Sequence, residues 1–284
     1  MSLVCPPIKS NYFYTIIVSY PKPKLQEALS IDEFKGNTWG EKYQCIITDP
    51  VNRVVLDILP SRQSFDLTGY FKSFPLKERE KVKFFVSDMW RAYFDIADVF
   101  LKNANRIVDK YHWIRLVIWA FEAVRKDEQR KLSSSHRKYF KRSRTLLTKR
   151  FDFLTDEQKQ QVNVMLYASV NLSRAHFFKE RFLKILDLDD LETAKISLKN
   201  WIDEASVCDI PQLEKCAKSL SNWLSGILCS FDNPITNGFT EGCNNKIKVL
   251  KRNAYGYRNF KRFRNRILHM FSHQHSRIQN QAAA

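Results

Sequence analysis

The chain has 284 residues, of which 47 are Lys or Arg and 30 are Asp or Glu, so its formal net charge is +17. A chain of this length can bury a sizeable core, and 44% apolar residues with 13% aromatics argue against disorder. The positive charge favours a polyanionic partner, nucleic acid before a membrane surface. Only 7 glycines are present, and neither GxGxxG nor GxxxxGKS/T occurs, which excludes the common phosphate-binding loops.

The cysteines and the N-terminal segment bear on the cellular compartment. The 6 cysteines have irregular spacings without a CxxC pair, which disfavours a zinc ribbon and favours buried thiols in a reducing compartment. Residues 12–19 are apolar, but they are too few to cross a bilayer and are followed by YPKPK rather than a cleavage site. We therefore expect a cytoplasmic protein without a membrane partner, associated with the nucleoid when it is bound to DNA.

The first part of the chain predicts a proline-containing tail or linker at 1–27 and then several strands. The strand patterns are 28–36, ending near Asp32; 42–62, two strands joined by the turn DPVN; VKFFVS at 82–87, leading directly into Asp88; and a short strand within 105–113. A helix is expected from about Trp90, and another in IRLVIWAFEAVRK at 114–126.

The second part of the chain is predicted to be helical. Apolar residues recur every three or four positions through 115–230, and a basic helix follows within 231–272, before a tail at 273–284. An α/β core, formed by 28–114 and 231–272 and interrupted by an all-helical insertion at 115–230, explains this order most simply.

Asp32 and Asp88 each stand at the predicted end of an apolar strand. A single Asp in this position is more often a turn or cap residue than a ligand. Adjacent parallel strands would, however, place both carboxylates at one edge of a sheet, where like charges repel. A divalent cation relieves that repulsion, and carboxylate oxygens together with substrate phosphates are typical Mg²⁺ ligands.

Glu241 begins a helix that is otherwise rich in Lys and Arg. Helical spacing places Asn245, Lys248 and Arg252 on the same face as Glu241, and a second, apolar stripe contains Cys243, Ile247, Leu250 and Ala254. The polar face could hold a metal at one end and phosphates along its length. An ordinary solvated face, with an acid favourably placed at the helix N-terminus, explains this pattern equally well.

Three segments resemble a known family. LSIDEFKG, VKFFVSDMWRAYF and ITNGFTEGCNNKIKVLKRNAYGYRNFKRFRNRIL together look like the catalytic region of ISL3-type insertion-sequence transposases, a DDE family, over about residues 28–270. The resemblance implies an RNase H-like mixed-sheet core with the helical insertion between the second Asp and the Glu. It implies a catalytic and metal-binding triad of Asp32 on the first strand, Asp88 after the fourth and Glu241 on a late helix.

The activity implied by this resemblance is two-metal phosphoryl transfer, with Mg²⁺ or Mn²⁺ as the ion, which nicks DNA and joins strands. The partners would be transposon ends and target DNA, bound by a possible homo-oligomer. Asp109-x-x-His112 resembles an element beside the second Asp in related transposases, where His112 could orient the phosphate; a packed core histidine is the equal alternative. The preferred DNA contacts are Lys248, Lys251, Arg252 and Arg258, while the nearby aromatics Tyr255, Tyr257, Phe260 and Phe263 are expected to pack in the core.

The sequence also departs from the family. A full-length member carries a cysteine-rich element and a helix-turn-helix before the catalytic region, whereas only about 30 residues precede the first strand here and no CxxC pair occurs. We therefore expect a truncated chain that lacks the end-recognition module. The alternative is a catalytically inactive remnant that binds DNA. A general RNase H-like nuclease is disfavoured by the long C-terminal motif.

Overall fold

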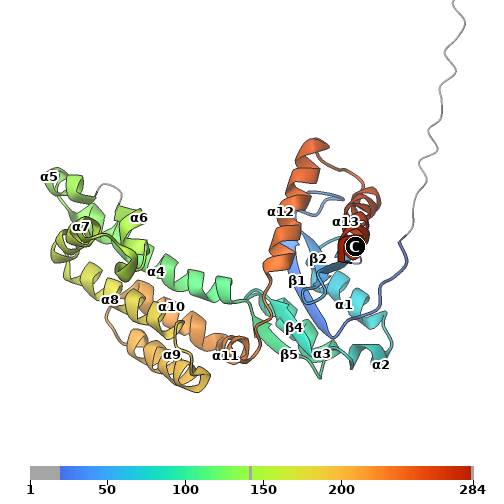
Figure 1. Cartoon of the computed structure of the whole chain (residues 1–284), viewed down its shortest axis with the longest axis horizontal. Coiled ribbons are helices and arrows are strands. Elements are labelled where there is room, and N and C mark those ends of the chain that lie inside the picture. Colours follow the sequence, from blue (N-terminus) through green and yellow to red (C-terminus); the bar gives the residue numbers. More distant parts are fainter. Residues whose placement is uncertain (1–19, 141–142, 283–284) are drawn as a thin grey trace, which may run out of the picture.

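The structure, a computed structural model, describes residues 20–140 and 143–282. The predictions for the apolar segment 12–19, for Cys5 and for most of the tail at 1–27 lie outside these residues. The described chain forms two lobes, an α/β lobe and a helical lobe, joined near the middle of the molecule (Figure 1). Among the described residues, no helix is both long and apolar enough to cross a membrane.

The α/β lobe contains a five-stranded mixed sheet in the order β3-β2-β1-β4-β5. The strands are β1 (Ala28–Phe34), β2 (Gln44–Asp49), β3 (Val54–Leu59), β4 (Phe84–Ser87) and β5 (Asn105–Val108). β1 pairs with β2, and β2 with β3, in antiparallel fashion, whereas β1–β4 and β4–β5 are parallel. The predicted α/β class is confirmed, including the parallel neighbours that precede Asp88 and contain Asp32.

The strand boundaries correct two details of the prediction. Asp32 does not end its strand, because it pairs with Ile46 in the β1–β2 ladder and β1 continues to Phe34. In 105–113, only Asn105–Val108 is a strand, because helical hydrogen bonding begins immediately after Asp109. His112 therefore lies in the first turn of a helix rather than between a strand and a helix.

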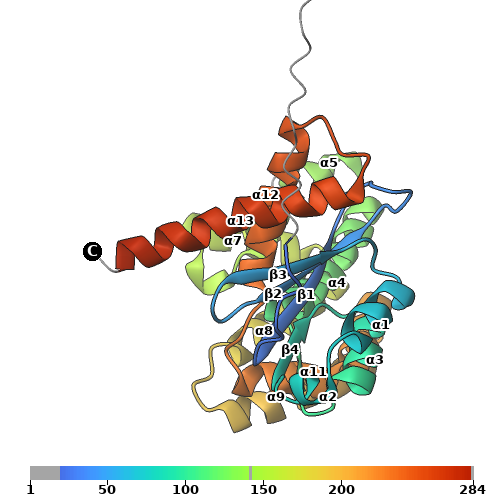
Figure 2. The ribbon, with the colours of Figure 1, turned by 90° about the vertical axis from the view of Figure 1, so that its right-hand side faces the viewer.

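Helices cover both faces of the sheet (Figure 2). On one face, α1 (Ser64–Lys72) and α3 (Arg91–Phe100) pack on Leu29 and Ile31 of β1, and the short α2 (Leu76–Arg79) follows α1. On the other face, α12 (Gly238–Asn253) and α13 (Phe260–Ala282) pack on Phe34. The period-two alternation of β1 therefore turns Ser30 and Asp32 toward the face that α12 covers.

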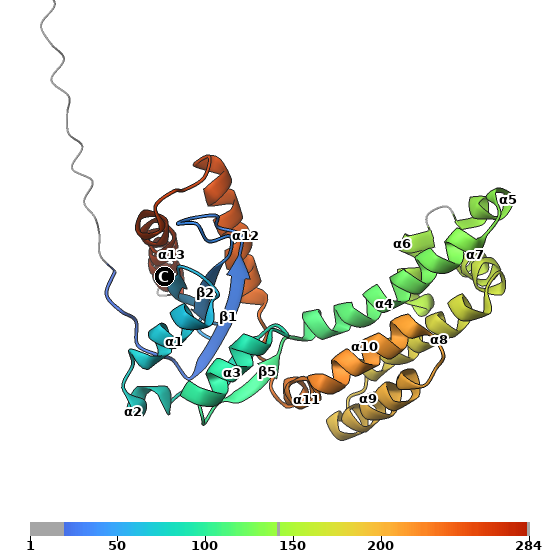
Figure 3. The same ribbon diagram turned by 180° about the vertical axis from the view of Figure 1, so that it is seen from behind.

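The helical lobe is built around the long helix α4 (Figure 3). Its helices are α4 (Lys110–Lys131), α5 (Ser134–Arg137), α6 (Ser143–Thr148), α7 (Asp156–Tyr167), α8 (Val170–Ile185), α9 (Leu191–Ser206), α10 (Pro211–Asn222) and α11 (Leu224–Asp232), with 3-10 turns at Lys138–Phe140 and Phe151–Phe153. Side-chain caps from Thr155, Ser169 and Asp190 start α7, α8 and α9. Trp113, Phe182 and Trp201 are buried in its core, and the helical prediction for this segment is confirmed.

The two lobes meet at β5. α4 leaves the sheet directly after β5, and α11 returns and packs against that strand. Gly226 permits this close approach, because a Cβ atom there would lie 2.8 Å from Val108 Cγ2. α12 follows and begins beside the start of α4 (Figure 1), so the junction brings the ends of several elements together.

The structure also refines the two stripes of α12. Cys243 and Ile247 are buried and Leu250 is half-buried, as the apolar stripe predicts. Ala254 is exposed and does not belong to that stripe, because α12 ends at Asn253. Tyr255 and Gly256, with φ angles of 53° and 99°, turn the chain away in the left-handed region.

Candidate active site

Asp32 is held on β1 by hydrogen bonds to both oxygens of its carboxylate. The side chain of Asn244 on α12 donates to Oδ2 over 2.8 Å, and the backbone N–H of Glu33 donates to Oδ1 over 2.8 Å. Burial raises the pKa of Asp32 to about 7, although the Glu33 hydrogen bond opposes the rise. The negative charges of Asp88 and Glu241 raise this pKa further.

Asp88 follows β4, the parallel neighbour of β1. Burial and the charge of Glu33 raise the pKa of Asp88 to about 6. Its Oδ1 atom is buried and has no hydrogen-bond partner among the described residues. A buried carboxylate oxygen without a partner is costly, and a cation beside Asp32 and Asp88 would satisfy it and offset their repulsion.

Glu241 lies in the first turn of α12, whose N-terminus is anchored by buried polar groups. Asp109 Oδ1 accepts a hydrogen bond of 2.9 Å from the backbone N–H of Asn237. Thr240 Oγ1 donates to Ser30 Oγ on β1 over 2.9 Å and lies 2.8 Å from Thr48 Oγ1 on β2. These contacts fix the start of the helix on the sheet, and with it the position of Glu241, whose charge raises the pKa of Asp32.

His112 on α4 contacts the same helix end. Its Nε2 atom lies 3.5 Å from Glu241 Oε1, and burial lowers its pKa. The Arg115 guanidinium lies 3.3 Å from His112 Nδ1 and can only donate, so Nδ1 accepts and the neutral ring carries its proton on Nε2. In this tautomer, His112 presents an N–H group to Glu241.

A second grouping shares Glu241. The potential metal-binding atoms of Asp109, His112 and Glu241 all lie within 4.8 Å of one another. In this group Asp109 already accepts from Asn237, and His112 presents a protonated nitrogen. Asp109, His112 and Glu241 are thus close enough to share one ion, whereas the case for an ion at Asp32 and Asp88 rests on the unpartnered Asp88 oxygen and on the repulsion that raises the pKa of Asp32.

Sequence reasoning missed Glu33 and Asn244. Glu33 accepts from Arg62 over 2.8 Å and from the Tyr93 hydroxyl over 3.0 Å. Arg62 lies 4.5 Å from the Tyr43 ring and 4.8 Å from the Trp90 ring. An available signal for Asn244 was its position four residues after Thr240, which makes it a polar residue on the buried side of α12; Glu33 carried no comparable signal.

The predicted DNA contacts differ in their surroundings. Lys248, Arg252 and Arg258 are exposed. Lys251 is half-buried, and its Nζ donates to the backbone carbonyl of Lys35 over 2.9 Å. The predicted aromatic packing holds for Phe260 and Phe263, which are buried, and for Tyr257, which stacks on Phe263 with a ring separation of 4.4 Å, but Tyr255 is fully exposed.

Comparison with known proteins identifies the family. The family of ISL3-type DDE transposases, described as "Transposase", matches residues 29–267. The match covers more than half of the chain, and the chain therefore belongs to this family.

Two relatives show the extent of the similarity. The transposase for insertion sequence element IS1001 of Bordetella parapertussis is 29% identical over 238 residues, which cover 82% of this chain and 58% of that protein. The transposase for insertion sequence element IS1557 of Mycobacterium tuberculosis is 29% identical over 118 residues, or 42% of this chain and 26% of that protein. The chain thus spans 58% or less of the length of these relatives, and no solved structure matches it significantly.

Proposed function

We propose that this chain carries the catalytic core of a DDE transposase, which cuts and joins DNA at transposon ends and at a target. The observation that supports the proposal is the electrostatic influence of Asp88 and Glu241 on Asp32, whose pKa both charges raise, together with the parallel pairing of β1, which contains Asp32, and β4, which precedes Asp88. The mixed sheet is then an RNase H-like core made of residues 28–114 and 231–272. Residues 115–230 are the helical insertion between Asp88 and Glu241.

The metal ligands on this proposal are Asp32, Asp88 and Glu241. Their oxygens are the hard donors that Mg²⁺ and Mn²⁺ take, and the unpartnered Asp88 Oδ1 supports an ion at this position. When bound, two divalent ions would activate the attacking oxygen and stabilise the leaving oxygen of the phosphodiester.

The other residues position these groups and the DNA. Asn244 fixes the orientation of the Asp32 carboxylate through its hydrogen bond. His112, with its proton on Nε2, can donate to a phosphate oxygen next to Glu241. Lys248, Arg252 and Arg258 extend from the site as exposed positive charges that can neutralise backbone phosphates, while Lys251 serves first to hold α12 on the loop after β1.

The direct test is thermal unfolding with and without Mn²⁺. We expect Mn²⁺ to raise the Tm of the wild-type chain, because an ion that binds only the folded state stabilises it. The double variant Asp32→Asn/Asp88→Asn should lose this increase. As a control with the same charge change, Asp189→Asn/Asp203→Asn alters two exposed carboxylates in the helical lobe and should keep the increase.

The outcomes separate the catalytic proposal from its alternative. An equal Mn²⁺ effect in the wild type and in the Asp32/Asp88 variant would contradict the metal assignment. If Mn²⁺ does not raise the Tm of the wild type, either alone or with DNA bound, and the wild type binds DNA without cleaving it, the chain is a DNA-binding remnant.

A further inference from the structure

A ladder of three side chains, the exposed Tyr111 and Trp119 with the half-buried Arg115 between them, lies along α4. Tyr111, Arg115 and Trp119 follow one another at intervals of four residues, so they lie on one face of the helix over about 12 Å. The Arg115 guanidinium lies 4.9 Å from the Tyr111 ring and 4.5 Å from the Trp119 ring. Tyr111 and Trp119 are nevertheless 56% and 54% exposed, so neither ring is covered by the fold.

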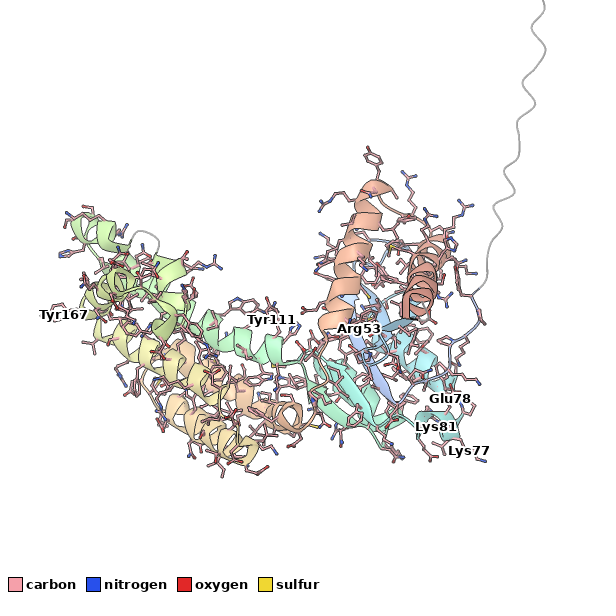
Figure 4. All side chains as sticks on the ribbon, viewed as in Figure 1. Arg53, Lys77, Glu78, Lys81, Tyr111 and Tyr167 are labelled. Carbon is pink, nitrogen blue, oxygen red and sulfur yellow. The ribbon has the colours of Figure 1, made fainter. Side chains whose placement is uncertain are left out.

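The ladder begins at the candidate active site. Arg115 contacts His112 Nδ1, and His112 in turn faces Glu241. Figure 4 shows Tyr111 on the side of α4 toward which α12 also rises. A molecule that reaches Glu241 along α12 therefore meets this face of α4 next.

The charge along this face suits a polyanion. Lys126 is exposed and lies seven residues after Trp119, which continues the same face by two helical turns. Arg115 adds a second cation between the rings. The acidic residues further along α4, Asp127 and Glu128, pair with Arg130 and Lys131.

We propose that Tyr111, Arg115 and Trp119 bind unpaired nucleotides of the DNA strand beside the cleavage site. This inference rests on the proposed function, because it takes DNA as the substrate. Aromatic rings stack on bases of any sequence, and a guanidinium contributes charge and cation–π contact. Bases inside a duplex are covered on both faces by their neighbours, so only an unpaired or extruded nucleotide offers a face to these rings.

The test compares two DNA probes in buffer with EDTA, so that no cleavage occurs. One is a blunt duplex, and the other is the same duplex with a five-nucleotide single-stranded overhang that contains 2-aminopurine. We expect the wild type to bind the overhang probe about 10-fold more tightly and to quench its fluorescence by stacking. Trp119→Ala and Tyr111→Ala should each lose most of this preference while their affinity for the blunt duplex is unchanged.

Two further variants make the result specific. Trp119→Phe keeps an aromatic ring and should restore most of the preference. Tyr167→Ala removes a ring that is 96% exposed at the distal end of the helical lobe, far from α12 in Figure 4, and should have no effect.

Several outcomes would overturn the inference. These are a wild type without overhang preference or a Trp119→Ala variant that keeps it. An equal loss of affinity for both probes in the alanine variants, or a change in the oligomeric state of these variants on gel filtration, would also overturn it. Mn²⁺-dependent nicking is measured on the same preparations. Nicking without overhang preference contradicts this inference alone, whereas overhang preference without nicking contradicts the catalytic proposal alone.

Discussion

The helical lobe and the junction beside α12 differ in the hydrogen-bond partners of their buried charged and polar side chains. In the helical lobe, the fully buried Lys179 donates to the carbonyls of Leu147 and Lys149, and Glu122 pairs with Arg125. At the junction, Asp88 Oδ1, Asn244 Oδ1 and Asn237 Nδ2 are buried without partners. Among the described residues, the helical lobe also contains such atoms, including Trp113 Nε1 and His176 Nε2. Unpaired buried polar atoms cost stability, and those of Asp88 and Asn244 lie at or beside carboxylates with raised pKa values, where a bound ion could complete them.

The two regions also differ in the kind of side chain at their centre. The core of the helical lobe is closed by large rings such as Trp113, Phe182 and Trp201, which pack against one another. At the junction, two carboxylates with raised pKa values lie on β1 and directly after its neighbour β4. Substitutions in the helical lobe are therefore expected to change stability, and substitutions at the junction to change metal binding and chemistry.

The largest expected effect comes from Asp88→Asn. We expect metal-dependent nicking of supercoiled DNA to fall by about 1,000-fold or more, because an amide cannot replace the anionic ligand. DNA affinity should stay the same or rise, since a negative charge is removed. Nicking at the wild-type rate by Asp88→Asn would show that this carboxylate is not part of the site.

Trp201→Ala should instead act on stability. Its ring is fully buried and its Nε1–H donates to the Phe178 carbonyl over 2.9 Å. Truncation should lower the free energy of unfolding by about 3–5 kcal/mol in urea titrations. Ile196→Ala, at an exposed position of the same helix, should cost much less. A Mn²⁺ response that disappears in folded Trp201→Ala protein would break the proposed division between the lobes.

Asn244→Ala tests whether the hydrogen bond to Asp32 matters for the metal. The loss of an orienting partner typically weakens metal binding by about 10- to 100-fold, and we expect a decrease of this size in a Mn²⁺ titration followed by thermal shift. Asn245→Ala, at the exposed next position of α12, is the matched control. Equal Mn²⁺ affinity in the two variants would exclude the positioning role of Asn244.

Lys248→Ala/Arg252→Ala should weaken DNA binding by roughly 10-fold at 100 mM salt. The slope of log K against the logarithm of the salt concentration should become shallower by about two, because two phosphate contacts are lost. The control is Lys77→Ala/Lys81→Ala, which removes two exposed charges at α2, on the side of the α/β lobe away from α12 (Figure 4). If both double variants lose the same affinity, the charge of the whole chain, and not α12, drives binding.

The smallest expected effect is a pH dependence in the helical lobe. Burial and the charge of Lys179 lower the pKa of His176 to about 3, even though Glu180 Oε1 lies 3.4 Å away. The unfolded chain therefore binds the proton more readily, and stability present above about pH 6.5 is lost as the pH falls, by about 1 kcal/mol at pH 5.5.

His176→Gln should flatten the profile of Tm against pH between 7 and 5, and His136→Gln, at an exposed position of α5, should not. An unchanged slope in His176→Gln would assign the acid sensitivity to other groups.

The local pattern of the sequence determined much of this protein. Short apolar segments predicted the strands around Asp32 and before Asp88, and the 3.6-residue period predicted the helical segment and the buried stripe of α12. Motifs in the right order predicted the family. These features depend on neighbours within a few residues, which a single sequence displays.

Other features were decided only by the tertiary structure. Asn244 reaches Asp32 across 212 positions, and Asp109 caps the start of α12 across 128. Glu33 faces away from Asp32 on the same strand, yet its charge raises the pKa of both Asp32 and Asp88. The ladder on α4 has its role only because α12 begins beside that helix. The local period indicates which face of an element is buried, but the packing of distant elements decides which side chains meet there.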